Sequence, residues 1–134
     1  MRKEMIRTLR TDPALRVLTE QNIEALVDNM LKSGHYIIEE HGFAFYIKCD
    51  DETLEHIQRN KHLLTDPNYA RELLTKTGKH IHFIGVYSTT PFQDGSISIL
   101  KGMHRVAERE KSSTVSWYNR TLEKFIIRRV RWPQ

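Results

Sequence analysis

One stretch of β-forming residues, His80–Ser88, constrains the fold of this chain more than any other segment. It contains Ile81, Phe83 and the run Ile84–Val86, which are residue types that favour a pleated strand. Segments with helical spacing precede and follow it. A strand between helices is typical of a sheet covered by helices, so an all-helical or all-β fold is not expected.

The clearest helix signal begins at Thr19, a residue type that caps helix N-termini. Apolar residues then recur at the spacing of one helix face: Ile23, Leu26, Val27, Met30 and Leu31. Gly34 stands where a left-handed C-terminal cap belongs. We predict a helix from about residue 20 to 33.

An antiparallel hairpin is predicted next, because two β-rich segments, His35–Glu40 and Phe43–Cys49, flank a glycine turn. The acidic cluster Asp50–Glu52 then favours a helix N-terminus, and that helix is expected to continue to Leu64. Asp66-Pro67 starts a further helix, which Gly78 is expected to end.

Three elements are predicted after the loop Thr89–Gly95: a helix at Ser96–Lys111 and strands at Thr114–Tyr118 and Phe125–Val130. At the other end of the chain, Met1–Thr11 alternates loosely and predicts an edge strand or a frayed start. Asp12-Pro13 predicts a turn or a helix entry.

This order predicts a single α/β (α+β) domain over residues 1–134, with a mixed, mostly antiparallel sheet flanked by helices. No apolar run approaches the roughly 20 residues of a membrane span, and no signal peptide is expected. The single cysteine, Cys49, excludes an internal disulfide and any multi-cysteine zinc site, so we expect a cytoplasmic protein. Next to acidic residues, its thiol is expected to be structural.

Positive charge is concentrated at the C-terminus. Residues 101–134 carry nine Lys/Arg against three Asp/Glu, whereas the rest of the chain carries 12 against 14. Arg128, Arg129, Arg131 and Trp132 interleave cations with an aromatic, a pattern compatible with nucleic-acid binding. The alternative is a solvated basic strand that protects a sheet edge from pairing. Exposed strands would also allow two chains to pair.

The histidines His80 and His82 project from one strand face, a spacing that can hold a metal. No pattern nearby supplies further ligands, so a half-exposed polar face is the simpler interpretation. Trp117 is expected in the core and Tyr118 on the opposite side of its strand.

The order of elements from Thr19 to Val130 resembles the GNAT superfamily of N-acyltransferases, and is similar to trimmed members from phages and prophages. In that family the fourth strand parts from the fifth at a bulge, and an acyl-CoA lies in the gap between them. The resemblance implies that Ile81–Ser88 and Thr114–Tyr118 are those strands. It also implies a phosphate-binding loop at the start of the next helix, which Gln93 and Gly95 partly echo.

The function implied is transfer of an acetyl or other acyl group from acyl-CoA to an amine. The implied cofactor-binding residues are Gly85, Val86, Tyr87, Gln93, Gly95, Ser96, Ile97 and Lys101. The implied base is Glu39, Glu40 or His82, and the implied acid is Tyr118. For each of these residues an ordinary structural role is the alternative.

Two departures from the family leave other functions open. The loop glycine is out of register beside Asp94, and Asn119–Lys124 is too short for the helix that usually carries the acid. A non-catalytic binding or assembly module of the same fold is therefore the first alternative. A basic nucleic-acid-binding domain is the second.

Overall fold

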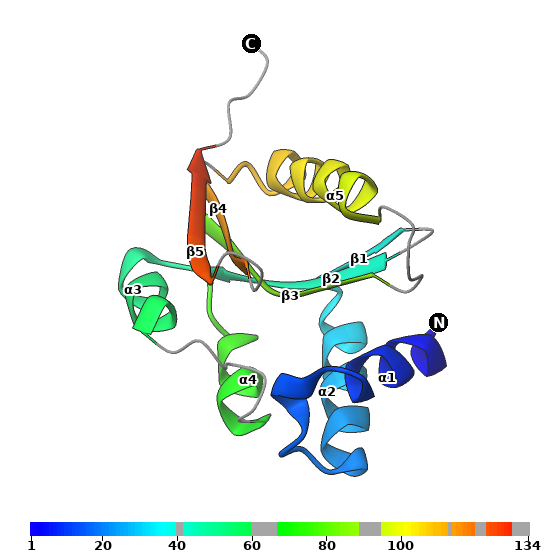
Figure 1. Ribbon diagram of the computed structural model, residues 1–134. Coiled ribbons are helices and arrows are strands. Elements are labelled where there is room, and N and C mark those ends of the chain that lie inside the picture. The colour runs from blue at the N-terminus through cyan, green and yellow to red at the C-terminus, as the bar shows by residue number, and fades with distance from the viewer. Residues whose placement is uncertain (40–41, 60–66, 89–94, 113, 120–122, 130–134) are drawn as a thin grey trace.

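A computed structural model describes residues 1–39, 42–59, 67–88, 95–112, 114–119 and 123–129, and among these not the side chains of 14, 67, 70, 88, 95–100 and 119. The chain forms one α+β domain in which helices flank a sheet (Figure 1). The elements are α1 (Arg2–Arg10), η1 (Pro13–Leu15), α2 (Glu20–Ser33), β1 (Tyr36–Glu39), β2 (Gly42–Cys49), α3 (Asp51–Arg59), α4 (Pro67–Leu73), β3 (His80–Ser88), α5 (Gly95–Arg109), β4 (Thr114–Asn119) and β5 (Lys124–Arg129).

The five strands lie side by side in chain order, β1-β2-β3-β4-β5. Only β3 and β4 are parallel; the other neighbouring pairs are antiparallel. The predicted mixed, mostly antiparallel sheet is therefore confirmed. The parallel pair follows from α5, because a crossover helix returns the chain to the same end of the sheet.

Helices cover both faces of the sheet. Helix α5 lies on one face, and α1, α2 and α4 lie on the other (Figure 1). On the α5 side, Tyr46, Ile81 and Phe83 pack with Met103, Val106 and Ala107. On the other side, Phe43, Phe45 and Tyr87 pack with residues of α1 and α2. Strand β2 is buried on both sides, which makes it the centre of the core.

The predicted helix at 20–33 is confirmed as α2, with both of its caps. The Thr19 side chain accepts a hydrogen bond from the Asn22 backbone N–H at 3.1 Å. Gly34 adopts the left-handed conformation, with φ of 77°. The hairpin is confirmed by antiparallel pairing of β1 with β2. Asp50 accepts a hydrogen bond from the Thr53 N–H at the start of α3.

The expectation for Met1–Thr11 was wrong, because these residues form helix α1. Met5, Ile6 and Leu9 share one helix face and are buried against α2. The loose alternation of Met5, Arg7 and Leu9 concealed the i, i+4 pair that this face uses.

Gly78 does not end α4, which stops at Leu73. A Cβ at residue 78 would lie 2.1 Å from the carbonyl oxygen of Cys49. The glycine is needed because the chain passes closely over the end of β2. Residues 60–66 and 89–94, where the rest of the predicted first helix and the predicted loop fall, lie outside the described residues.

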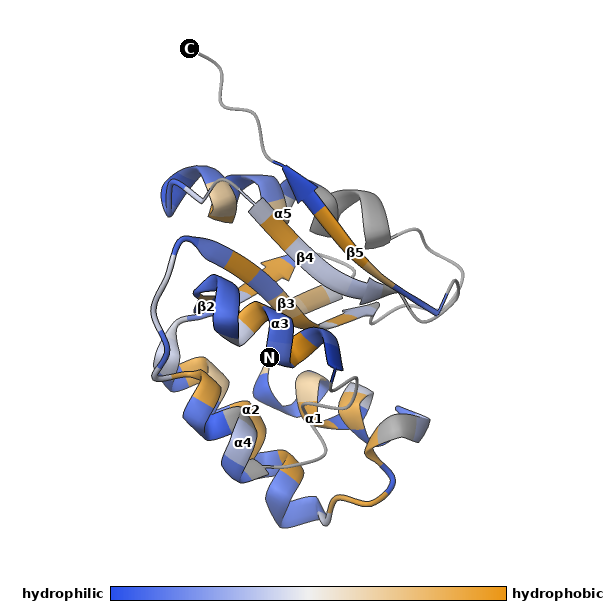
Figure 2. Ribbon diagram, turned by 90° about the vertical axis from the view of Figure 1, so that its left-hand side faces the viewer, coloured by the Kyte–Doolittle hydropathy of each residue, from blue (hydrophilic) through white to orange (hydrophobic). Residues whose placement is uncertain are grey.

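Within the described part of the chain, none of the helices combines the length and the apolar character needed to cross a bilayer (Figure 2).

Candidate functional site

The parallel strands β3 and β4 are paired over only part of their length. The register joins His80–Phe83 to Thr114–Trp117 and ends there. Strand β3 continues to Ser88 and β4 to Asn119. Beyond the last pair, Gly85 and Val86 therefore lie next to β2 on one side and to no described β4 residue on the other.

A bulge in β3 stands at the point where the two strands part. Phe45 of β2 is opposite Gly85 and Tyr46 is opposite Phe83, so Ile84 is an extra residue in β3. A bulge bends its strand and increases the local twist. The bend provides a physical reason for β3 to leave β4 immediately after Phe83.

The residues of β3 beyond Phe83, which we call the parted end, present an apolar side chain and backbone groups. Val86 is 41% exposed, although its neighbours in β3, Gly85 and Tyr87, are buried. Gly85 has no side chain to obstruct the approach of a ligand to the backbone. The side chain of Tyr87 is turned into the core, where its hydroxyl donates a hydrogen bond to Asp12 at 3.0 Å.

Helix α5 begins after the parted end of β3. Gly95, Ser96 and Ile97 form its first turn, and Lys101 is exposed further along the helix. Free N–H groups at the start of a helix favour an anion. Gln93 lies outside the described residues.

Glu39 lies at the end of β1, on the α5 side of the sheet. Its carboxylate forms an ion pair with Arg105 of α5, and its side chain is 21% exposed. Gly102 allows this approach, because a Cβ there would lie 3.0 Å from Glu39 Oε1 and 2.7 Å from Ile37 Cγ2. Glu40 lies outside the described residues.

His82 lies in the paired part of β3, not at the parted end. Its Nδ1 is 2.7 Å from Ser116 Oγ, and its ring stacks on Phe125 with the centroids 5.3 Å apart. Burial, with a smaller contribution from neighbouring His80, lowers the pKa of His82 to about 3. The imidazole is therefore neutral at physiological pH.

The predicted half-exposed polar face of His80 and His82 was wrong, because both are almost fully buried. His80 Nε2 lies 2.7 Å from the same Ser116 oxygen, and its Nδ1 hydrogen-bonds Thr114. Hydrogen bonds to Thr114 and Ser116 of β4 compensate for the loss of water around the two buried rings. Strand alternation alone does not predict these partners. Among the described residues, no group of three or more His, Cys, Asp or Glu is arranged to hold a metal.

Tyr118 lies one residue beyond Trp117, the last residue of β4 that pairs with β3. Alternation places Tyr118 on the same face as Ser116, which is the face opposite α5. Glu39 and Tyr118 therefore occupy opposite faces near the same end of the sheet. Trp117 is half-buried against the core on the α5 side, which agrees in part with its expected core position.

Cys49 is buried, as expected for a structural thiol. Burial raises its pKa to about 12, and the charges of Asp50 and Asp51 contribute.

The sequence analysis did not predict that Arg105 and Gly102 would hold Glu39 in place. Their only signal was their spacing on one face of the predicted helix. It also missed a cavity of about 450 Å³ between α3 and α4, where His56 and Tyr69 meet edge to face. This cavity adjoins Asp50, which directly follows β2, and none of its lining residues belongs to β3.

Comparison of the chain with protein-family models and with curated proteins gives no match. The arguments for function therefore come from the geometry of the chain itself.

Proposed function

We propose that this chain binds an acyl-CoA between the parted ends of β3 and β4 and transfers the acyl group to an amine. The observation that carries the proposal is the register of the parallel pair, which ends at Phe83 and Trp117 beside the bulge at Ile84. Two parallel strands that separate at a bulge leave backbone groups to bind an extended, amide-containing ligand.

The residues at this end fit such a ligand in four respects. Gly85 permits close approach to the backbone, and Val86 offers an exposed apolar contact for a thioester arm. The first turn of α5, at Gly95–Ile97, offers N–H groups for a pyrophosphate, and Lys101 adds positive charge further along. Acyl-CoA would supply an activated acyl group as its thioester.

Glu39 and Tyr118 are proposed for proton transfer. As the amine nitrogen forms its bond to the acyl carbon, it gives up a proton, which Glu39 accepts through water. As the carbon–sulfur bond breaks, the departing sulfur takes a proton from the Tyr118 hydroxyl. The ion pair with Arg105 holds the Glu39 carboxylate in position. His82 is not retained as the base, because it is buried in the paired stretch.

A second candidate is a module that binds acyl-CoA without catalysing transfer. It is favoured by the placement of Glu39 and Tyr118 on opposite faces of the sheet, with Glu39 already bound by Arg105. Calorimetry and turnover measured together distinguish the two functions, because both require binding and only the first requires transfer.

The test is titration of the protein with acetyl-CoA in a calorimeter, followed by release of free thiol with a panel of amines. Acetyl-CoA at ten times its Kd is expected to stabilise the fold by about 1.4 kcal/mol. The absence of heat and of stabilisation at high micromolar acetyl-CoA would contradict both candidates.

A bulky side chain at the parted end is expected to block binding. Val86→Trp should weaken acetyl-CoA binding at least tenfold, because the indole occupies the space beside the exposed segment. The matched control is Val17→Trp, since Val17 is also an exposed valine, at 77%. Circular dichroism checks that both variants are folded. Equal affinity of the two folded variants for acetyl-CoA would show that the parted strands are not the binding site.

A further inference from the structure

The hairpin of β4 and β5 carries a surface that the acyl-transfer proposal does not use. Trp117 is opposite Ile126, Val115 is opposite Arg128 and Asn119 is opposite Lys124. Directly opposed residues point to the same face, so Trp117, Lys124, Ile126 and Arg128 share the α5 side of the sheet. We refer to these four residues as the hairpin surface.

No described helix covers the outer part of this surface. Helix α5 packs on β1, β2 and β3. Strand β5 stands at the edge of the sheet (Figure 1), and none of its residues belongs to the hydrophobic cluster that packs under α5. Lys124 and Arg128 are exposed, and Trp117 and Ile126 are half-buried. An aromatic and an aliphatic side chain are therefore open to solvent between two cations.

The hairpin surface is positively charged. Strand β5 has three basic residues, Lys124, Arg128 and Arg129, and no acidic residue, and β4 has no charged residue. Glu123, which precedes β5, is the only acidic residue in the described part of the hairpin. An anionic partner is expected, and pairing of two copies through β5 would place like charges opposite one another.

The arrangement of Trp117 and Arg128 favours nucleic acid over an acidic protein. The guanidinium of Arg128 lies over the Trp117 ring, 5.6 Å from its centroid. A planar cation on an aromatic ring presents a flat surface on which a nucleobase stacks, and neighbouring lysine and arginine hold phosphates. An acidic peptide would pair with the cations, but it has no planar base to stack on the Arg128 guanidinium and the Trp117 ring.

We propose that the hairpin surface binds single-stranded nucleic acid, with Lys124 and Arg128 at phosphates and the Arg128–Trp117 pair beneath a base. The probe is a fluorescein-labelled oligothymidylate of about 20 nucleotides, long enough for a typical single-strand site. Anisotropy titrations over a series of salt concentrations should show binding that weakens as salt rises.

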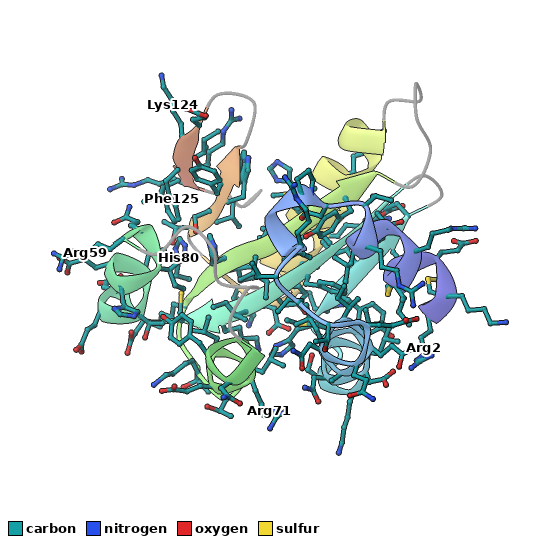
Figure 3. The ribbon with its side chains drawn as sticks, turned by 60° about the horizontal axis from the view of Figure 1, so that its bottom comes forward. Arg2, Arg59, Arg71, His80, Lys124 and Phe125 are labelled. Atoms are coloured by element: carbon teal, nitrogen blue, oxygen red, sulfur yellow. The ribbon has the colours of Figure 1, made fainter. Side chains whose placement is uncertain are left out.

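The variant Lys124→Glu/Arg128→Glu should bind the oligonucleotide at least tenfold more weakly, with a salt slope reduced by about 2. The matched control, Lys32→Glu/Arg71→Glu, makes the same change in net charge on α2 and α4. Figure 3 shows Lys124 far from Arg71, across the molecule. Equal losses in the two variants would overturn the proposal, because they would show a response to net charge alone.

Two further outcomes decide the class of partner. Polyglutamate that competes as well as unlabelled oligothymidylate would overturn the nucleic-acid assignment in favour of acidic protein. Competition by oligothymidylate alone supports it. The substitutions lie on an exposed edge strand, so the variants should retain the circular dichroism spectrum of the unaltered chain.

Discussion

At the scale of single residues, the most constrained group is a buried series of hydrogen-bonded side chains between β3 and β4. Ser116 Oγ lies 2.7 Å from a ring nitrogen of both His80 and His82, and Ser116 is fully buried. A hydroxyl has one hydrogen, so it donates to one ring and accepts an N–H from the other. This arrangement suits two neutral imidazoles, because protonating both rings would place two positive charges side by side, which the charge of Asp51 near His80 offsets only in part.

The stability of the fold should therefore fall in mild acid. Burial lowers the pKa of both His80 and His82, that of His82 to about 3, whereas an unfolded histidine titrates near 6.5. The stabilising contribution is complete above about pH 6.5 and is lost as the pH falls towards 3. His82 should account for a loss of about 2 kcal/mol between pH 7 and 5, measured by urea unfolding, and His80 should add to the loss in the same direction.

The variant His82→Leu should reduce this loss, because it removes one of the two buried groups that cannot accept a proton. The exposed His104 is the control, and His104→Leu should leave the pH dependence unchanged. A pH dependence that is the same in both variants would show that His82 does not contribute.

At the scale of elements, the close approach of α5 to β1 depends on one glycine. Gly102 is buried in α5, where alanine would be the better helix former by about 1 kcal/mol. The methyl group of an alanine would lie 2.7 Å from the Cγ2 methyl group of Ile37, which is attached to the branched Cβ. That branch is fixed close to the backbone, so it cannot swing aside, and the helix itself must move.

Gly102→Ala should therefore destabilise the domain by about 1–3 kcal/mol, the usual range for overpacking, despite its higher helix propensity. Thermal or urea unfolding measures the change. Adding Ile37→Leu, which removes the branch at Cβ, should restore part of the loss. His104→Ala, at an exposed neighbouring position, also raises helix propensity and should cause no loss; an equal loss there would show that the effect does not come from the contact with Ile37.

At the scale of the whole molecule, the three hydrophobic clusters all use the same sheet. Strand β2 contributes to each of them, with Phe43 and Phe45 in the first, Tyr46 in the second and Ile47 in the third. Loss of any one cluster would expose one face of this strand. The layers are therefore expected to unfold together.

Urea unfolding should accordingly be a single cooperative transition. Tryptophan fluorescence includes Trp117 at the β4–β5 end, whereas far-UV circular dichroism is dominated by the helices. The two signals should give the same midpoint, with a slope of about 1–3 kcal/mol per molar urea. Separate midpoints would show that the α1–α2 layer unfolds independently of the sheet.

The sequence alone determined the features that depend on neighbouring residues. The capping by Thr19, the turn at Gly34, the hairpin and the bounds of β3 all follow from local patterns, and the structure confirms each one. Helix α1 was missed because its apolar residues are too few to distinguish a helix period from loose alternation within one short segment.

The tertiary structure alone decided which distant groups meet. The burial of His80 and His82 depends on Ser116, the position of Glu39 depends on Gly102 and Arg105, and the parting of β3 from β4 depends on one extra residue, Ile84, opposite β2. Each involves residues far apart in the chain. Local periodicity specifies which side of an element a residue faces, but contacts between elements are fixed only when the whole core packs.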